Sequence, residues 1–190
     1  MRPVVFLDRD GVINRKAPEG EYVTSWDEFE FLPGARDALA LLSVPGGPAL
    51  VVATNQRGIA RGRMTRASVD DIHRRMLASL AAGGVTIDGI EVCPHEIGTC
   101  DCRKPDVGLF RRAAEHDPSL DLDRAAVVGD SLSDLEAAHR LGAQAFLVSI
   151  DPDPILARAA ALGVGVTAHA PSLHELVLDG ALDHLLAVAS

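Results

Sequence analysis

The strongest constraint on this chain is a short apolar run that ends in two aspartates. Residues 4–7 are apolar and rich in β-branched side chains, and Asp8, Asp10 and Gly11 follow them. The pattern predicts a buried strand whose carboxyl end turns sharply and presents two acids at its tip. Ligands of open parallel sheets bind at that end. A solvated turn has the same composition, but a calcium loop is disfavoured because Val12 stands where another oxygen ligand is required.

Two such acids suit nucleophilic chemistry on a phosphate. If Asp8 is the nucleophile, Asp10 can serve as its acid/base partner. Both carboxylates carry negative charge, and so does a phosphate ester. A divalent cation would therefore be needed to let them approach one another.

Apolar strand-like runs alternate with stretches of helical spacing along the whole chain. This alternation predicts a three-layer, Rossmann-like doubly wound parallel sheet with helices on both faces. The 190 residues suffice for one domain with a full core, so we expect a single domain over 1–190. Residues 14–32 are polar and irregular, and we expect them to form a flap over the acidic strand end. Further strands are expected at 49–53, 89–92, 125–128 and 143–149, and helices at 33–42, 65–82, 105–114, 154–162 and from Pro171.

The overall charge disfavours several classes of partner. The net charge is −9, from 18 basic and 27 acidic residues, whereas a nucleic-acid partner favours a basic surface. No apolar run approaches the roughly 20 residues that span a bilayer, and the segment before Asp8 is too short for a secretory signal. We therefore expect a cytoplasmic protein, monomeric, with a small phosphorylated substrate and no nucleic-acid or membrane partner.

Two further strand ends carry polar residues. Thr54, Asn55 and Gln56 follow the run at 49–53, where a hydroxyl could donate to a phosphate oxygen or simply cap a turn. Asp130 follows the run at 125–128, and Asp134 falls in the first turn of the next helix, where a carboxylate is favoured. Asp130 could complete a magnesium site of oxygen ligands.

All three cysteines lie with one histidine in a ten-residue loop, 93–102. Its members are Cys93, His95, Cys100 and Cys102. Three thiolates and an imidazole make a tetrahedral zinc set, and four protein ligands would close the site, so the metal would be structural. In a reducing compartment this clustering favours metal over a disulfide; free thiols or a redox pair are the alternatives.

Two cations follow the last cysteine directly. Arg103 and Lys104 would be held rigidly by a zinc-pinned loop, with Arg suited to forked contacts to phosphate and Lys acting as a point charge. By itself a basic pair is more often solvated. Its adjacency to the cysteine loop is what favours a functional role.

The order of these motifs resembles the haloacid dehalogenase superfamily of phosphohydrolases over residues 4–134. The segments 6–14, 54–62 and 93–105 are similar to its zinc-containing, capless branch, which holds D-glycero-D-manno-heptose 1,7-bisphosphate 7-phosphatase and histidinol-phosphatase. The resemblance implies a haloacid dehalogenase-like core without a large cap domain and a Mg²⁺-dependent phosphatase that acts through an aspartyl-phosphate. The short spacing between the motifs likewise leaves no room for a separate cap.

The resemblance also implies a role for each matched residue. Asp8 would attack phosphorus, and Asp10 would protonate the leaving oxygen and then activate water. Thr54 and Lys104 would hold the transferring oxygens, with Asp134 in support. The remaining implied sets are Asp8, Asp10 and Asp130 for Mg²⁺, Cys93, His95, Cys100 and Cys102 for structural Zn²⁺, and Asn55, Gln56, Arg57 and Arg103 for substrate.

Heptose 1,7-bisphosphate is the expected substrate, and three alternatives stay open. Histidinol phosphate is the nearest, because the loop between His95 and Cys100 is shorter than in many heptose phosphatases. A zinc-loop binding module without activity is disfavoured, since such a module would need neither Asp8 nor Lys104. A nucleic-acid end phosphatase is disfavoured by the acidic charge.

Overall fold

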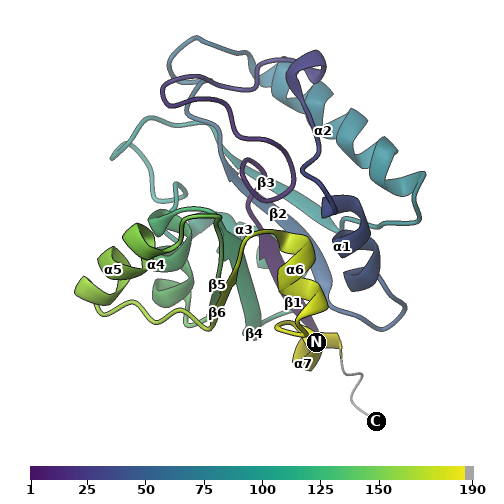
Figure 1. The fold of residues 1–190 in the computed structure, drawn as a ribbon. Helices are drawn as coiled ribbons and strands as arrows, with labels where there is room; N and C mark the ends of the chain where they lie inside the picture. Colours follow the sequence, from purple (N-terminus) through teal and green to yellow (C-terminus); the bar gives the residue numbers. More distant parts are fainter. Residues whose placement is uncertain (187–190) are drawn as a thin grey trace.

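The computed structural model describes residues 1–186, which form one six-stranded sheet flanked by helices (Figure 1). Every strand pair is parallel, in the order β3-β2-β1-β4-β5-β6. This confirms the predicted doubly wound parallel sheet. The strands are β1 (Arg2–Leu7), β2 (Ala49–Asn55), β3 (Gly89–Cys93), β4 (Leu120–Gly129), β5 (Gln144–Val148) and β6 (Ala168–Ala170).

Helices cover both faces of the sheet, because the side chains of its central strands alternate between two apolar layers. Val5 and Leu7 of β1 pack into one layer, and Val4 and Phe6 into the other. The first layer contains α1 (Ala35–Leu42), α2 (Arg66–Ala81), α6 (Leu173–Leu178) and α7 (Asp183–Leu186), and the second contains α3 (Gly108–His116), α4 (Leu132–Leu141) and α5 (Asp153–Ala161).

The order of the strands reverses beside β1. The chain runs outward from β1 through β2 to β3, and then returns to β4 on the other side of β1. Such a reversal opens a crevice at the carboxyl ends of the central strands, where ligands of doubly wound folds bind. The fold thus brings the ends of β1, β2 and β4 to one place.

Four elements differ from the sequence prediction. One is the last helix, expected to run on from Pro171, which the structure divides into α6 and α7. Helix α3 begins at Gly108, not at 105, because Asp106 N–H donates to the carbonyl of Arg103 and closes a turn there. Strand β4 begins at Leu120, where it continues past a register shift in β1 to pair with Arg2. A sixth strand, β6, is not among the predicted strands, since it has only three residues and two of them are alanine.

The segment 14–32 contains one 3-10 turn, η1 (Trp26–Glu28), and an isolated bridge between Asn14 and Phe31, and is otherwise irregular, as expected for a flap. Among the helices described in residues 1–186, none has the length and apolar character needed to cross a bilayer.

Candidate active site

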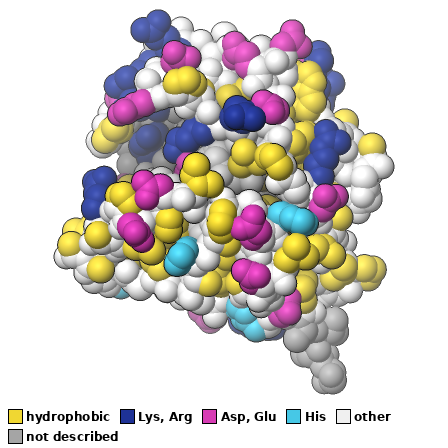
Figure 2. All heavy atoms as spheres, viewed as in Figure 1, with side chains coloured by type: hydrophobic (Ala, Val, Ile, Leu, Met, Phe, Trp, Pro, Cys, Tyr) yellow, Lys and Arg dark blue, Asp and Glu magenta, His cyan; other side chains and the backbone are white. Residues whose placement is uncertain are grey.

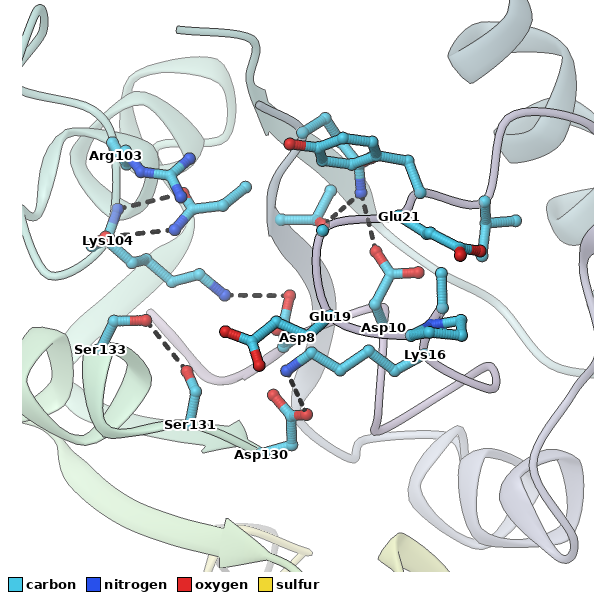
Figure 3. Close-up of a pocket in the computed structure, with 18 residues that line it drawn as sticks. Asp8, Asp10, Lys16, Glu19, Glu21, Arg103, Lys104, Asp130, Ser131 and Ser133 are labelled. Carbon is cyan, nitrogen blue, oxygen red and sulfur yellow. Dashed lines mark hydrogen bonds and ion pairs between the residues drawn. The ribbon is translucent and has the colours of Figure 1, made fainter. Parts of the chain in front are cut away.

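A cavity of about 320 Å³ lies at the carboxyl ends of the central strands. Segment 16–23 of the flap lines one side, and Figure 3 shows acidic and basic side chains from both halves of the chain pointing into the space. Nine of the residues singled out from the sequence meet in or directly beside this cavity. They are Asp8, Asp10, Thr54, Asn55, Gln56, Arg103, Lys104, Asp130 and, behind Lys104, Asp134.

Lys104 is a buried cation between two acids. Its Nζ lies 3.0 Å from Oδ1 of Asp8 and 2.6 Å from Oδ1 of Asp134. The same ammonium donates to the carbonyl of Ala53 at 2.6 Å, at the end of β2. Burial lowers the pKa of Lys104, but the two carboxylates outweigh burial and raise it above its usual value. Lys104 therefore remains charged and faces the tip of β1.

Asp8 lies at the tip of β1, where burial and neighbouring acids act on it together. Burial raises its pKa most, Lys104 opposes the rise, and Asp134, Asp130 and Asp10 add to it, giving a pKa of about 7. A carboxylate with only 14% of its side chain exposed, lying among three other acids, needs additional positive charge to stay ionised. This observation favours a cation at the site.

Asp10 has an opposite environment. Arg9 donates to both of its oxygens at 3.0 Å, while Asn14 and Gln56 each donate to one at 2.9 Å. Burial alone would raise the pKa of Asp10, but Arg9 and the hydrogen bonds from Asn14 and Gln56 outweigh it and lower the pKa. Asp8 and Asp10 thus have pKa values displaced in opposite directions, upward for Asp8 and downward for Asp10. Contrasting environments let two carboxylates take different roles. For Asp8 to attack as an ionised nucleophile and Asp10 to donate a proton, a bound cation and phosphate would have to reverse these directions.

The residues expected to touch substrate differ in their surroundings. Gln56 is buried and donates to Thr54 Oγ1 at 2.9 Å as well as to Asp10, so it orients both. Asn55 exchanges two 3.1 Å hydrogen bonds with the backbone of Lys104 and fixes that loop against β2.

Arg103 and Arg57, the two arginines expected to bind substrate, differ in their position relative to the cavity. Arg103 lines the cavity, and its buried Nη1 has no hydrogen-bond partner within residues 1–186. Arg57 lies outside the lining and pairs with Glu96 at 3.4 Å. Of the two, only Arg103 both lines the cavity and has a buried nitrogen without a partner in the described residues.

Three carboxylates form a group that fits a divalent cation. One oxygen each from Asp8, Asp130 and Asp134 lie within 4.8 Å of one another. In the described part of the chain, the buried Oδ1 of Asp130 has no hydrogen-bond partner. The ammonium of Lys16, from the flap, lies 2.7 Å from the other oxygen of Asp130 (Figure 3). Oxygen ligands without protons suit Mg²⁺, so the donor set fits that ion.

The cysteine loop folds into a second group of ligands. The Sγ atoms of Cys93 and Cys100 are 3.7 Å apart, those of Cys100 and Cys102 are 3.4 Å apart, and Nδ1 of His95 lies 3.3 Å from Cys102 Sγ. Zn–S bonds of about 2.3 Å in a tetrahedron imply ligand separations of about 3.7 Å. The four side chains therefore fit a closed zinc site next to Arg103 and Lys104.

Positive side chains gather at the same end of the molecule, despite the net charge of −9. In Figure 2, Lys and Arg side chains gather in the upper half of the face, the end toward which β1 runs in Figure 1. A local excess of cations favours an anionic ligand there.

Four contributors were not singled out from the sequence as site residues. They are Arg9 and Asn14, which bind Asp10, His73, which contacts Arg9, and Lys16, which pairs with Asp130. His73 lies in the apolar stripe of α2, and its helical spacing by itself predicts a packing residue. The available signal was the arginine between the two aspartates, since a charged residue there must either reach solvent or find buried partners.

Comparisons with known proteins agree with this geometry. A family model described as HAD-hydrolase-like matches residues 101–169. A D-glycero-alpha-D-manno-heptose-1,7-bisphosphate 7-phosphatase of Mycobacterium bovis is 49% identical over 146 residues, which cover 74% of each chain. The chain belongs to the haloacid dehalogenase-like hydrolases. It is a phosphatase of that family, as its motifs predicted. A D-glycero-beta-D-manno-heptose-1,7-bisphosphate 7-phosphatase of Pseudomonas putida is 44% identical over 146 residues, covering 76% of this chain and 81% of that one.

A solved structure extends the similarity of this phosphatase over almost the whole chain. The D,D-heptose 1,7-bisphosphate phosphatase of B. bronchiseptica, complexed with magnesium and phosphate, is 36% identical, with a TM-score of 0.81. The match covers 95% of this chain and 99% of that one. The phosphatase core of the fold is thus shared throughout.

Proposed function

We propose that this phosphatase removes the 7-phosphate of D-glycero-D-manno-heptose 1,7-bisphosphate through an aspartyl-phosphate on Asp8. The substrate rests on the names of relatives at 49% and 44% identity and of the structural neighbour at 36%. The covalent step rests on one observation above all, the contact of Asp8 Oδ1 with the buried Lys104 ammonium at 3.0 Å. That contact places a fixed cation beside the atom that would attack phosphorus.

In the first step an oxygen of Asp8 attacks phosphorus and the bond to the sugar oxygen breaks. Lys104 and the Thr54 hydroxyl would stabilise the charge on the transferring oxygens, which is the main protein contribution to phosphoryl transfer. Asp10 would give a proton to the departing C7 oxygen. In the second step Asp10 would take a proton from water as that water attacks the aspartyl-phosphate, which regenerates Asp8.

Two metal ions belong to this proposal. Mg²⁺ would be held by Asp8, the backbone carbonyl of Asp10 and Asp130, with Asp134 nearby holding Lys104. When bound, the ion would neutralise negative charge on the carboxylates and the phosphate. A structural Zn²⁺ on Cys93, His95, Cys100 and Cys102 would hold the loop that carries Arg103 and Lys104.

Arg103 would bind the part of the substrate that does not react, since the residue lines the cavity and its buried Nη1 lacks a partner in residues 1–186. Asn55 and Gln56 would act from the same wall, and Arg57 from its rim. We further propose that the enzyme works as a monomer in the cytoplasm.

The test is phosphate release by the pure protein with Mg²⁺, comparing heptose 1,7-bisphosphate with histidinol phosphate at matched concentrations. We expect a large excess in kcat/KM for the heptose and the loss of one phosphate only. A preference for histidinol phosphate would overturn the substrate assignment and leave the aspartyl-phosphate step intact. No Asp8-dependent release from either would overturn both.

A further inference from the structure

Arg9 is a fully buried arginine between the two site aspartates. Its side chain has no exposed surface, although both neighbours in sequence face the cavity. Its Nη2 donates to both oxygens of Asp10 at 3.0 Å. Its Nη1 lies 3.1 Å from Nε2 of His73. One guanidinium therefore joins Asp10 to a residue of α2.

The direction of the hydrogen bond to His73 follows from its partners. A guanidinium has only donors, so Nε2 of His73 must accept and the imidazole must be neutral. Burial and the charge of Arg9 both hold the pKa of His73 down, to about 3. The pair is thus a donor and an acceptor at every pH where the protein would work.

His73 is fixed from behind by the apolar side of its helix. Val69, Ile72 and Met76 are all buried, and the last two pack into the first core layer with Val5 and Leu7. Close-packed side chains leave an imidazole on the same helix little freedom to turn. His73 can therefore hold Arg9 in one orientation, and Arg9 can hold the plane of the Asp10 carboxylate.

We propose that His73 is a positioning residue that keeps the Asp10 carboxyl group aimed at the leaving oxygen by holding Arg9. The inference rests on the proposed function, in which Asp10 is the acid of the first step. Asn14 and Gln56 each bind one oxygen of Asp10, but only Arg9 binds both. Without the His73 acceptor the guanidinium of Arg9 is free to rotate. Its Nη2 then no longer donates to both oxygens of Asp10.

Two substrates with different leaving groups can distinguish this positioning role of His73 from a general contribution to the stability of the fold. A sugar alkoxide needs the proton from Asp10 as its bond to phosphorus breaks. A nitrophenolate departs without one. For p-nitrophenyl phosphate, kcat/KM then reports attack by Asp8 and is insensitive to the aim of Asp10.

The experiment compares His73→Phe, which keeps an aromatic ring without an acceptor, with His73→Gln, whose amide oxygen replaces Nε2. Met76→Leu is the packing control on the same helix. Each variant is assayed with heptose 1,7-bisphosphate and with p-nitrophenyl phosphate, and its fold is checked by circular dichroism and thermal unfolding. We expect H73F to lower kcat/KM for the heptose about tenfold to a hundredfold and for the aryl ester less than about twofold. H73Q should recover most of the loss.

An equal loss for both substrates, or H73Q no better than H73F, would overturn the positioning role. Should H73F not fold, His73→Leu removes the same acceptor with a smaller side chain. Failure of the proposed function would be seen in a different variant. Asp8→Asn would then keep an activity close to that of the unaltered protein.

Discussion

The Nζ atom of Lys104 lies 3.0 Å from Oδ1 of Asp8, although half the chain separates the two residues. Asp134 holds the same ammonium from the other side at 2.6 Å. One buried cation thus pairs with a carboxylate that directly follows strand β1 and with another from helix α4. This arrangement links the proposed chemistry to the stability of the fold. Substitutions at Asp8 and at Lys104 can show how much each residue contributes to activity and to stability.

Replacement of Asp8 by Asn should abolish turnover and preserve the fold. The amide has nearly the same shape but cannot form the covalent intermediate, so we expect kcat to fall at least about 10³-fold. Phosphate release and circular dichroism are the measurements. Asp106→Asn is the matched control, since that carboxylate pairs with Arg140 at the surface. Substantial remaining activity in the Asp8 variant would exclude the aspartyl-phosphate mechanism.

Replacement of Lys104 by Met should reduce both activity and stability. It leaves the buried carboxylate of Asp134 and the half-buried carboxylate of Asp8 without their cation. Breaking a buried pair from one side costs about 3–5 kcal/mol. Urea unfolding should show a loss of that size. Arg140→Met, which breaks only exposed pairs, should cost at most about 1 kcal/mol. Equal losses in the two variants would contradict the buried-pair account.

Removal of zinc should loosen the segment that carries Lys104. We expect pure protein to contain about one zinc per chain and Cys102→Ser to contain much less. Hydrogen exchange across 100–108 should then become faster, while strands β1 and β4 keep their protection. Metal analysis that finds no zinc in the unaltered protein would remove the basis for the structural-loop proposal.

The stability of the protein should fall on mild acidification because of His73. Its pKa of about 3 in the fold lies below the usual 6.5, so the unfolded chain binds a proton first as the pH drops. The groups that face it are Arg9, Asp10, Asp70 and Arg66. Stability from this group is therefore complete above pH 6.5 and declines as the pH falls toward 3.

His73→Gln has no proton to bind at this position. Between pH 7.5 and pH 5 the free energy of unfolding of the wild type should fall about 2 kcal/mol more than that of H73Q. Urea unfolding at both pH values measures the difference. Parallel curves for the two proteins would show that His73 does not titrate as its burial implies.

The sequence predicted the sheet and most of the site because both depend on local patterns. Apolar runs that end in polar residues identify strand tips, and parallel topology brings those tips together. The environment of Asp10 could not be predicted, since it depends on where the buried Arg9 side chain points. The close packing around Gly11 could not be predicted either. That glycine has φ +92°, and a Cβ there would collide with the carboxylate of Asp130. This contact joins Gly11, after β1, to Asp130, after β4. Neither segment of the sequence by itself indicates that the two residues meet.

His73 illustrates the same limit. Its spacing in α2 matched the apolar stripe, and the residue is indeed buried with that stripe. What spacing could not reveal is that the interior at this point contains a guanidinium. Helix α3 was placed too early for a related reason, because the turn from Arg103 to Asp106 is made by backbone groups.

The cysteine loop has a consequence for how this enzyme family can diversify. Residues 96–99 lie between two pairs of proposed zinc ligands, and Ile97 there is 61% exposed. The segment starts and ends close to the proposed zinc ligands His95 and Cys100, and Lys104 follows the last ligand, Cys102, by two residues. Its length and composition can therefore change without altering the path of the chain to Lys104. If zinc ties this loop as proposed, residues 96–99 could be altered to try new substrates while the proposed catalytic cation, Lys104, keeps its place.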